Sequence, residues 1–128
     1  MASYLLDTTV LIDYLRGRSV AVELLNTLVN QGHQIGVCCI SVAELYAGVN
    51  EAQRAGADRL IDALDYREVS REIAKEAGRY RYEFARRGSV LSTADTLVAA
   101  TAIAYGSVLL TANAGDFPME ELELLGHR

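Results

Sequence analysis

Four acidic side chains of this 128-residue sequence stand near the ends of short apolar runs, far apart along the chain: Asp7, Glu44, Asp95 and Asp116. Carboxylates that are brought together repel one another unless a cation lies between them. Oxygen ligands without histidine or cysteine suit hard cations such as Mg²⁺ or Mn²⁺. If the chain gathers these acids, they predict a metal site that can activate water and hydrolyse phosphodiester bonds.

The elements around these acids indicate an α/β fold. Five apolar runs are typical of strands: 4–6, 35–40, 66–69, 108–110 and 122–124. Six segments with helical spacing or capping residues predict helices: 8–15, 20–31, 42–49, 53–64, 71–87 and 93–105. Strands that alternate with helices predict a single domain over 1–128, a three-layer sandwich with a mostly parallel central sheet of four to five strands.

This topology explains why the acids should meet. In open α/β sheets, ligands bind outside the carboxyl ends of the strands. Asp7 directly follows the first strand, and Asp116 lies just beyond the fourth. Glu44 is expected in the first turn of the helix after strand 35–40, and Asp95 in the first turn of the alanine-rich helix. Four carboxylates from distant segments are therefore expected at one edge of the sheet.

Each acid also has an ordinary structural explanation. Asp7 can cap a helix, Glu44 can be a solvated helix residue, and Asp116 can belong to a turn. Asp95 can form a capping box with Ser92. The joint placement of the four at strand ends favours the functional interpretation over four separate structural roles.

The expected helix starts depend on capping side chains. Thr8 or Thr9 is predicted to cap the first helix, and serines are predicted to cap four others: Ser19, Ser41, Ser70 and Ser92. Asp13 follows in the first helix. It is either an outer acid of the site or, as favoured here, a solvated partner of Arg16 three residues later.

Further polar residues are candidates for supporting roles. Thr111 and Asn113 can orient Asp116 or a metal-bound water, or simply end a strand and form an Asx-turn. An arginine-rich stretch that includes Tyr82 can grip RNA through phosphate contacts and stacking, or form a charged solvated helix face. Its candidate RNA-binding residues are Arg79, Arg86 and Arg87.

Composition narrows the class of protein. Net charge is −5, so a nucleic-acid partner would have to bind a local basic patch, and eleven of the twelve basic residues are arginine. Cys38 and Cys39 are adjacent, which is neither zinc-ligand spacing nor a disulfide framework. The two histidines, His33 and His127, form no visible metal or general-base arrangement. No apolar run approaches the ~20 residues of a membrane span, and no signal peptide is recognised, so a cytoplasmic protein is expected.

Four ordered motifs carry a resemblance to a known family. They are Leu6-Asp7-Thr8-Thr9-Val10-Leu11-Ile12-Asp13, Ser41-Val42-Ala43-Glu44-Leu45, Ser92-Thr93-Ala94-Asp95-Thr96-Leu97-Val98-Ala99-Ala100-Thr101-Ala102 and Leu110-Thr111-Ala112-Asn113-Ala114-Gly115-Asp116-Phe117. Together they resemble the PIN domain over nearly the whole chain, and the VapC group within that family. The acids identified from strand ends coincide with the family's metal-binding positions.

The resemblance implies a Mg²⁺- or Mn²⁺-dependent endoribonuclease that is the toxin of a toxin–antitoxin pair. It also implies a homodimer, and a cognate antitoxin that blocks the site. Two positions depart from the family's pattern. Thr9 stands where Ser or Asn is frequent, and Ala112 stands where Arg is frequent, which puts a substrate contact at that position in doubt.

Two other functions stay open at this stage. A catalytically silent PIN-like module could bind RNA or protein without cleaving either. A phosphoacceptor receiver domain also gathers acids at strand ends, but it needs a lysine beyond a late strand. The only lysine is Lys75, in the middle of a predicted helix.

Overall fold

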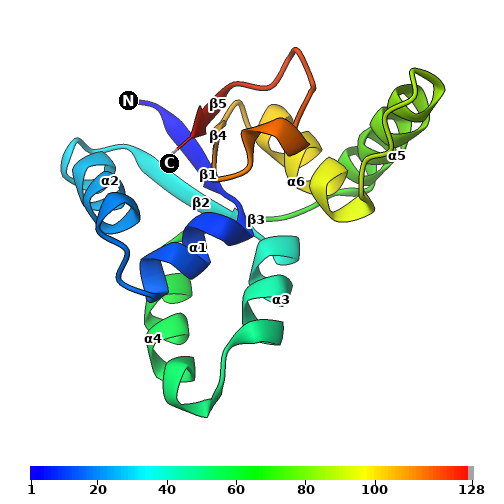
Figure 1. The fold of residues 1–128 in the computed structure, drawn as a ribbon. Coiled ribbons are helices and arrows are strands. Elements are labelled where there is room, and N and C mark those ends of the chain that lie inside the picture. The colour runs from blue at the N-terminus through cyan, green and yellow to red at the C-terminus, as the bar shows by residue number, and fades with distance from the viewer. Residues whose placement is uncertain (127–128) are drawn as a thin grey trace.

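The central sheet has five parallel strands, in the order β3-β2-β1-β4-β5 (Figure 1). A computed structural model describes residues 1–126, so His127 lies outside the described residues. The strands are β1 (Ser3–Leu6), β2 (Gln34–Cys38), β3 (Asp65–Arg67), β4 (Val108–Thr111) and β5 (Leu124–Gly126). The predicted three-layer α/β sandwich is confirmed, and the described sheet is wholly rather than mostly parallel.

Within residues 1–126, six α-helices and one 3₁₀ turn connect the strands. They are α1 (Thr8–Leu15), α2 (Ser19–Asn30), α3 (Cys39–Gly48), α4 (Glu51–Asp62), α5 (Arg71–Arg86), α6 (Thr93–Ala104) and η1 (Ala114–Asp116). Most bounds lie within a few residues of those predicted, since apolar periodicity and turn glycines mark them. Gly88, for example, ends α5 with a φ of 86°, a backbone conformation that side chains rarely adopt.

Successive strand residues alternate between two hydrophobic layers. Leu5 and Leu109 pack in one cluster with residues of α5 and α6, such as Phe84 and Ala99. Leu6 and Leu110, their next neighbours along the strands, pack in a second cluster with residues of α1 to α4. Helices α1 to α4 therefore cover one face of the sheet, and α5 and α6 cover the other (Figure 1).

Strand β1 lies at the centre of the sheet, between β2 and β4. The chain moves from β1 towards one edge through β2 and β3, and then returns to β1's other side for β4 and β5. Such a reversal leaves a crevice beyond the carboxyl ends of the two strands where it occurs. The segments that follow β1 and β4 meet at this point.

The start of α3 differs from the prediction. The strand β2 ends at Cys38 and runs straight into α3, so the expected strand residues Cys39 and Ile40 are helical. Ser41 is therefore inside the helix and does not cap it. Its side chain is fully buried, and its Oγ has no hydrogen-bond partner within residues 1–126.

The other predicted serine caps divide into two groups. Ser70 and Ser92 cap α5 and α6 as expected, accepting backbone N–H bonds from Ile73 and Asp95. Ser19 is instead the first residue of α2, whose N-cap position is Arg18 without a side-chain capping bond. No helix in the described part of the chain is long and apolar enough to cross a membrane.

Candidate active site

Asp7 directly follows β1 and caps α1, so its ordinary structural explanation is confirmed and the predicted cap at Thr8 or Thr9 is wrong. Its Oδ1 accepts hydrogen bonds from the Thr9 backbone N–H at 2.9 Å and from the Thr9 hydroxyl at 2.5 Å. Its Oδ2 accepts a hydrogen bond from the Thr111 hydroxyl on β4, also at 2.5 Å. The side chain is 6% exposed, so these donors hold a buried carboxylate in a fixed orientation.

Glu44 projects from the second turn of α3, not the first, because that helix begins three residues earlier than predicted. The carboxylate is exposed. Its Oε1 accepts a hydrogen bond of 2.6 Å from the hydroxyl of Thr8, the first residue of α1. The helix that follows Asp7 therefore also fixes the position of Glu44.

Asp95 lies in the first turn of α6, where its backbone N–H donates to the Ser92 side chain at 3.0 Å. Burial raises the pKa of the Asp95 carboxyl, a hydrogen bond with Ser92 opposes this, and the charges of three other acids raise it further. Those three are Asp116, Glu44 and Asp7. This influence agrees with the pocket that Asp95 shares with the other three acids.

Asp116 ends the 3₁₀ turn η1, just after β4, and its side chain is exposed. Its backbone N–H donates to the Asn113 carbonyl oxygen at 3.0 Å. Asn113 in turn donates its backbone N–H to the Thr111 hydroxyl at 3.0 Å. The turn that presents Asp116 is thus anchored to the same hydroxyl that bonds Asp7.

The four acids line a single pocket of about 300 Å³ at the carboxyl end of the sheet, named here the acid pocket. Its walls are Asp7, Thr8, Thr9, Glu44, Asp95, Val98, Asn113, Asp116 and Phe117. Within residues 1–126, no three acid, histidine or cysteine side chains are already grouped as a metal ion would require. The carboxylates therefore face a shared space without closing around its centre. A set of oxygen ligands around such a space fits a hard divalent cation.

Sequence reasoning missed part of this pocket. Thr8 and Thr9 were predicted to be helix caps and matched the first family motif, but neither was named as a site residue, although their hydroxyls bond two of the acids. The Thr8 contact joins residues 36 positions apart, and no local pattern indicates it. The buried Thr111 hydroxyl bonds Asp7 directly, and it reaches the turn that carries Asp116 only through the backbone N–H of Asn113.

The candidate RNA-binding arginines lie on or next to α5, and none of them lines the acid pocket. Arg79 is paired with two carboxylates, at 2.6 Å from Glu76 and 2.9 Å from Glu83. Arg86 stacks on the ring of Tyr82, and Arg87 on the ring of Phe84. All three guanidinium groups lie over aromatic rings, that of Arg79 over Tyr80, so its two ion pairs are what set Arg79 apart and fit the solvated-face interpretation.

The prediction that Asp13 is a solvated partner of Arg16 is wrong, because Asp13 is buried. It is 3% exposed, and its carboxylate lies 3.4 Å from Nε of Arg18, beyond the end of α1. Its backbone oxygen also accepts the Arg18 N–H, at 3.0 Å. These two contacts with Arg18 fix the turn between α1 and α2. Asp13 does not line the acid pocket.

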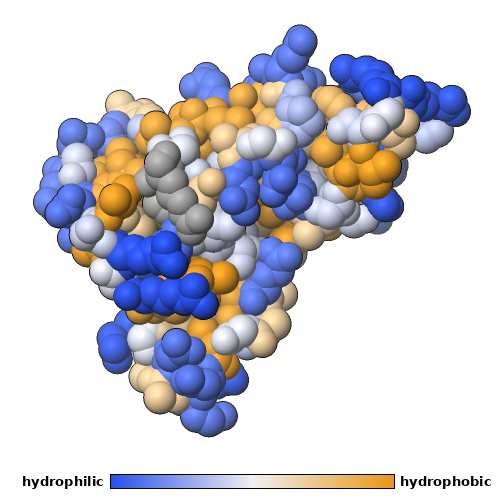
Figure 2. Space-filling view, viewed as in Figure 1, coloured by the Kyte–Doolittle hydropathy of each residue, from blue (hydrophilic) through white to orange (hydrophobic). Residues whose placement is uncertain are grey.

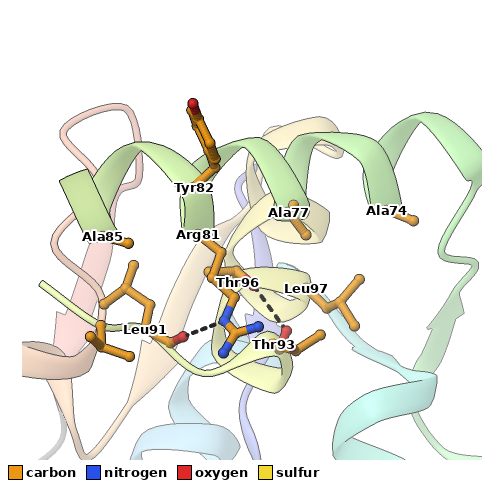
Figure 3. A pocket seen from close by; sticks show the side chains of 11 residues that line it. Ala74, Ala77, Arg81, Tyr82, Ala85, Leu91, Thr93, Thr96 and Leu97 are labelled. Atoms are coloured by element: carbon orange, nitrogen blue, oxygen red, sulfur yellow. Dashed lines mark hydrogen bonds between the residues drawn. The ribbon is translucent and has the colours of Figure 1, made fainter.

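A larger hollow of about 590 Å³ lies between α5 and α6, and we call it the α5–α6 groove. It is lined by Ala74, Ala77, Gly78, Arg81, Tyr82, Ala85, Val90, Leu91, Thr93, Thr96 and Leu97. Arg81 extends into it, and its Nε donates to the Leu91 carbonyl oxygen at 2.8 Å (Figure 3). Figure 2 shows apolar surface in the part of the molecule where α5 and α6 lie. No acidic side chain among the described residues lines this groove, so it is chemically distinct from the acid pocket.

Known proteins resemble this chain in both sequence and structure. The model of the PIN domain matches residues 4–118. Ribonuclease VapC19 of Mycobacterium tuberculosis is 39% identical over 117 residues, covering 90% of this chain and 92% of that protein. Ribonuclease VapC10 of the same species is 32% identical, covering 91% and 87%.

Among solved structures, VapBC2 from Rickettsia felis, bound to a DNA fragment from its promoter, contains a chain with the same fold. The TM-score is 0.88 at 23% identity, over 98% of this chain and 99% of that chain. Because the PIN domain model spans most of the residues, and VapC19 is similar along nearly its whole length, this chain belongs to the PIN domain family.

Proposed function

We propose that this chain is a metal-dependent endoribonuclease, which hydrolyses phosphodiester bonds of RNA as the toxin of a toxin–antitoxin pair. The observation that carries the proposal is the acid pocket, where four carboxylates from four separate segments line one space. The relatives named Ribonuclease VapC19 and VapC10 support RNA as the substrate. PIN membership sets aside the receiver-domain hypothesis, and Lys75 lies on α5, outside the acid pocket.

The proposed metal ligands are Asp7, Glu44, Asp95 and Asp116, and the proposed cofactor is Mg²⁺ or Mn²⁺. When bound, such an ion lowers the pKa of a coordinated water and offsets charge on the phosphate oxygens. Carboxylates are hard oxygen donors, and the pocket offers neither imidazole nor thiolate, so its chemistry fits these ions.

The side chains in and around the pocket have different proposed roles. Asp7 has both oxygens held by hydroxyl donors, which fixes the direction in which its free lone pairs point. Burial and the charges of its acidic neighbours raise the pKa of Asp95, and a bound cation would oppose this shift. Asn113 lines the pocket, and we assign its side-chain amide to orienting a phosphate oxygen or a water. Thr111 does not line the pocket, and its hydroxyl acts through Asp7 and through the backbone N–H of Asn113.

The decisive experiment is cleavage of a labelled single-stranded RNA by the purified protein. Cleavage should require Mn²⁺ or Mg²⁺, stop on addition of chelator, and be lost in Asp116→Asn. Cleavage that persists in chelator would overturn the metal-dependent mechanism. A folded protein that binds RNA in Mn²⁺ but never cleaves it would favour the alternative, a catalytically silent PIN-like module.

The proposed RNA contacts outside the pocket are Arg86 and Arg87, with a smaller part for Arg79. Arg86 and Arg87 lie over aromatic rings, an arrangement that holds a guanidinium rigidly for a phosphate. Arg79 already has two carboxylate partners, which balance its charge.

A homodimer is part of the proposal, with the α5–α6 groove as the surface that receives the second copy. In a two-fold dimer both copies use the same surface, so that surface must carry both the side chains that protrude and the hollow that receives them. Val90 and Tyr82 line this groove, and they are 83% and 59% exposed. Small residues of α5, such as Ala74 and Gly78, provide the hollow beside them. Sedimentation should give a dimer that Val90→Asp dissociates.

The other proposed partner is a cognate antitoxin that blocks the acid pocket, and the proposed location is the cytoplasm. Structures similar to this chain include a toxin–antitoxin complex from Klebsiella pneumoniae, with a TM-score of 0.81. That likeness, at 24% identity, supports the fold on which such a pairing would be built. Loss of RNA cleavage on addition of the antitoxin, restored by its removal, is the corresponding measurement.

A further inference from the structure

Two threonine hydroxyls connect Asp7 to the segment that carries Asp116. The Thr9 hydroxyl donates to Asp7 Oδ1 at 2.5 Å and accepts the backbone N–H of Ala112 at 3.0 Å. The Thr111 hydroxyl donates to Asp7 Oδ2 at 2.5 Å and accepts the backbone N–H of Asn113 at 3.0 Å. Each oxygen of the buried carboxylate is therefore linked, through one hydroxyl, to one of two consecutive amides after β4.

These two links differ in what they hold. Thr111 and Asn113 are two residues apart, so that contact shapes only the local turn. Thr9 and Ala112 are 103 residues apart, so that contact fastens α1 to the segment after β4. This segment leads through exposed residues, among them Asn113 and Gly115, to Asp116. Few buried side chains fix it, so a single hydrogen bond has a large share in its position.

We infer that Thr9 is a positioning residue, which sets the place of Asp116 relative to Asp7 and thereby the affinity of the acid pocket for a divalent cation. The inference rests on the proposed function, since it takes these acids as the metal ligands. Thr9 does not have to touch the cation or the RNA. Its hydroxyl donates a hydrogen bond to Asp7 and accepts one from the backbone N–H of Ala112, in the segment that leads to Asp116.

Neighbouring Thr8 provides a matched control. Its hydroxyl donates to Glu44 at 2.6 Å, and no hydrogen bond joins it to Ala112 among the described residues. Removing either hydroxyl takes one donor from one acid of the pocket. Only removal of the Thr9 hydroxyl also releases the segment after β4.

The experiment uses the full chain and the variants Thr9→Val, Thr9→Ala, Thr9→Ser and Thr8→Val. Amide hydrogen exchange of Ala112 is followed by NMR in chelator, and Mn²⁺ binding is measured by calorimetry. Both hydroxyl-free variants at position 9 should speed Ala112 exchange and weaken Mn²⁺ binding about 10- to 100-fold, the usual effect of losing a residue that orients a ligand. Thr9→Ser should retain both properties. Thr8→Val should leave Ala112 exchange at the wild-type rate.

Wild-type Ala112 exchange and Mn²⁺ affinity in folded Thr9→Val or Thr9→Ala would overturn the inference. So would a loss in Thr9→Ser as large as in Thr9→Val, because the hydroxyl would then not be the cause. If the wild type itself binds no Mn²⁺, the proposed function fails, and the role of Thr9 in metal affinity fails with it. Unchanged Mn²⁺ affinity in Thr9→Val, with a wild type that binds the ion, contradicts only the role of Thr9.

Discussion

Thr111 and Asp7, 104 residues apart, are joined by a hydrogen bond of 2.5 Å between the hydroxyl of one and the carboxylate of the other. Both side chains are buried. Thr111 is the last residue of β4, and Asp7 directly follows β1, the strand that pairs with β4. A hydrogen bond to a buried carboxylate is among the stronger ones in proteins, since charge assists it. This contact therefore ties the end of β4 to the residue after β1, and it orients an acid of the proposed active site.

Thr111→Val tests how much this hydrogen bond contributes to the stability of the protein. Valine has nearly the same shape, so the change removes one donor and leaves a buried carboxylate oxygen without its partner. The free energy of unfolding should fall by about 1 to 3 kcal/mol. Urea denaturation in the presence of chelator measures this, with Thr111→Ser as the control that keeps the hydroxyl. Equal stability of Thr111→Val and the wild type would contradict the assignment.

Asp7→Asn should separate structure from activity in the cell. Asparagine caps helices about as well as aspartate, so the start of α1 should survive. Expression of the wild type without its antitoxin should arrest growth, and the variant should relieve the arrest. Circular dichroism of the purified variant checks that it is folded. A soluble, folded and equally toxic variant would show that the proposed mechanism is wrong.

The pH dependence of the metal-free protein should reflect Asp95, whose pKa is raised by burial and then by the charges of Asp116, Glu44 and Asp7. A carboxyl with a raised folded-state pKa binds more protons in the folded protein than in the unfolded chain. The free energy of unfolding should thus fall as pH rises from the ordinary aspartate value of about 4 through the raised value.

Asp95→Asn removes this contribution, so its melting temperature in chelator at neutral pH should exceed that of the wild type. Mn²⁺ at a hundred times its Kd should stabilise the wild type by about 2.7 kcal/mol, and the variant by much less. Melting curves of both proteins, with chelator and with Mn²⁺, measure the two effects. A lower metal-free melting point with an intact Mn²⁺ response would remove Asp95 from the cluster.

The arginines of α5 should differ in their contribution to RNA binding. Removing an arginine that binds one phosphate should flatten the log–log dependence of affinity on salt by about 0.7 for single strands. We expect this for Arg86→Ala and Arg87→Ala, measured with RNA in chelator so that nothing is cleaved. Arg79→Ala should change the slope little, because Glu76 and Glu83 already balance that charge. Three unchanged slopes would assign all three arginines to a solvated face.

Ser41→Ala distinguishes the observed α3 from the predicted one. If Ser41 capped the helix, this change would lower the free energy of unfolding of the protein by about 1 kcal/mol. Ser41 is instead buried with an Oγ that is unpaired within residues 1–126, and burial of an unpaired hydroxyl is itself costly. Stability to urea should therefore be unchanged or up to about 1 kcal/mol higher in Ser41→Ala. A loss of the size expected for a cap would contradict the position of Ser41 inside α3.

Much of the fold could be predicted because local patterns determine it. Short apolar runs give strands, and a parallel sheet brings their carboxyl ends to one edge, so Asp7 and Asp116 were placed without knowledge of any contact. Local patterns failed where two elements join without a loop. Residues 35–40 are apolar almost throughout, and periodicity cannot show that Cys39 and Ile40 already belong to a helix.

Contacts between distant segments account for the rest. Asp7, Thr8 and Thr9 are all good capping residues, and the sequence cannot tell which of them caps while the others bond elsewhere. The bonds from Thr8 to Glu44 and from Thr111 to Asp7 depend on the packing of whole elements. Such contacts follow from the tertiary fold, so the details of the site required the structure.

The central position of β1 also has a consequence for synthesis of the protein on the ribosome. Asp7, Glu44 and Asp95 are translated well before β4, which pairs with β1 and brings in Thr111 and then Asp116. A nascent chain that stops before Val108 lacks both the hydroxyl that bonds Asp7 Oδ2 and the fourth acid. The reactive centre of the proposed ribonuclease is thus completed last, because the messenger must be read beyond Asp116 before all four acids of the acid pocket exist.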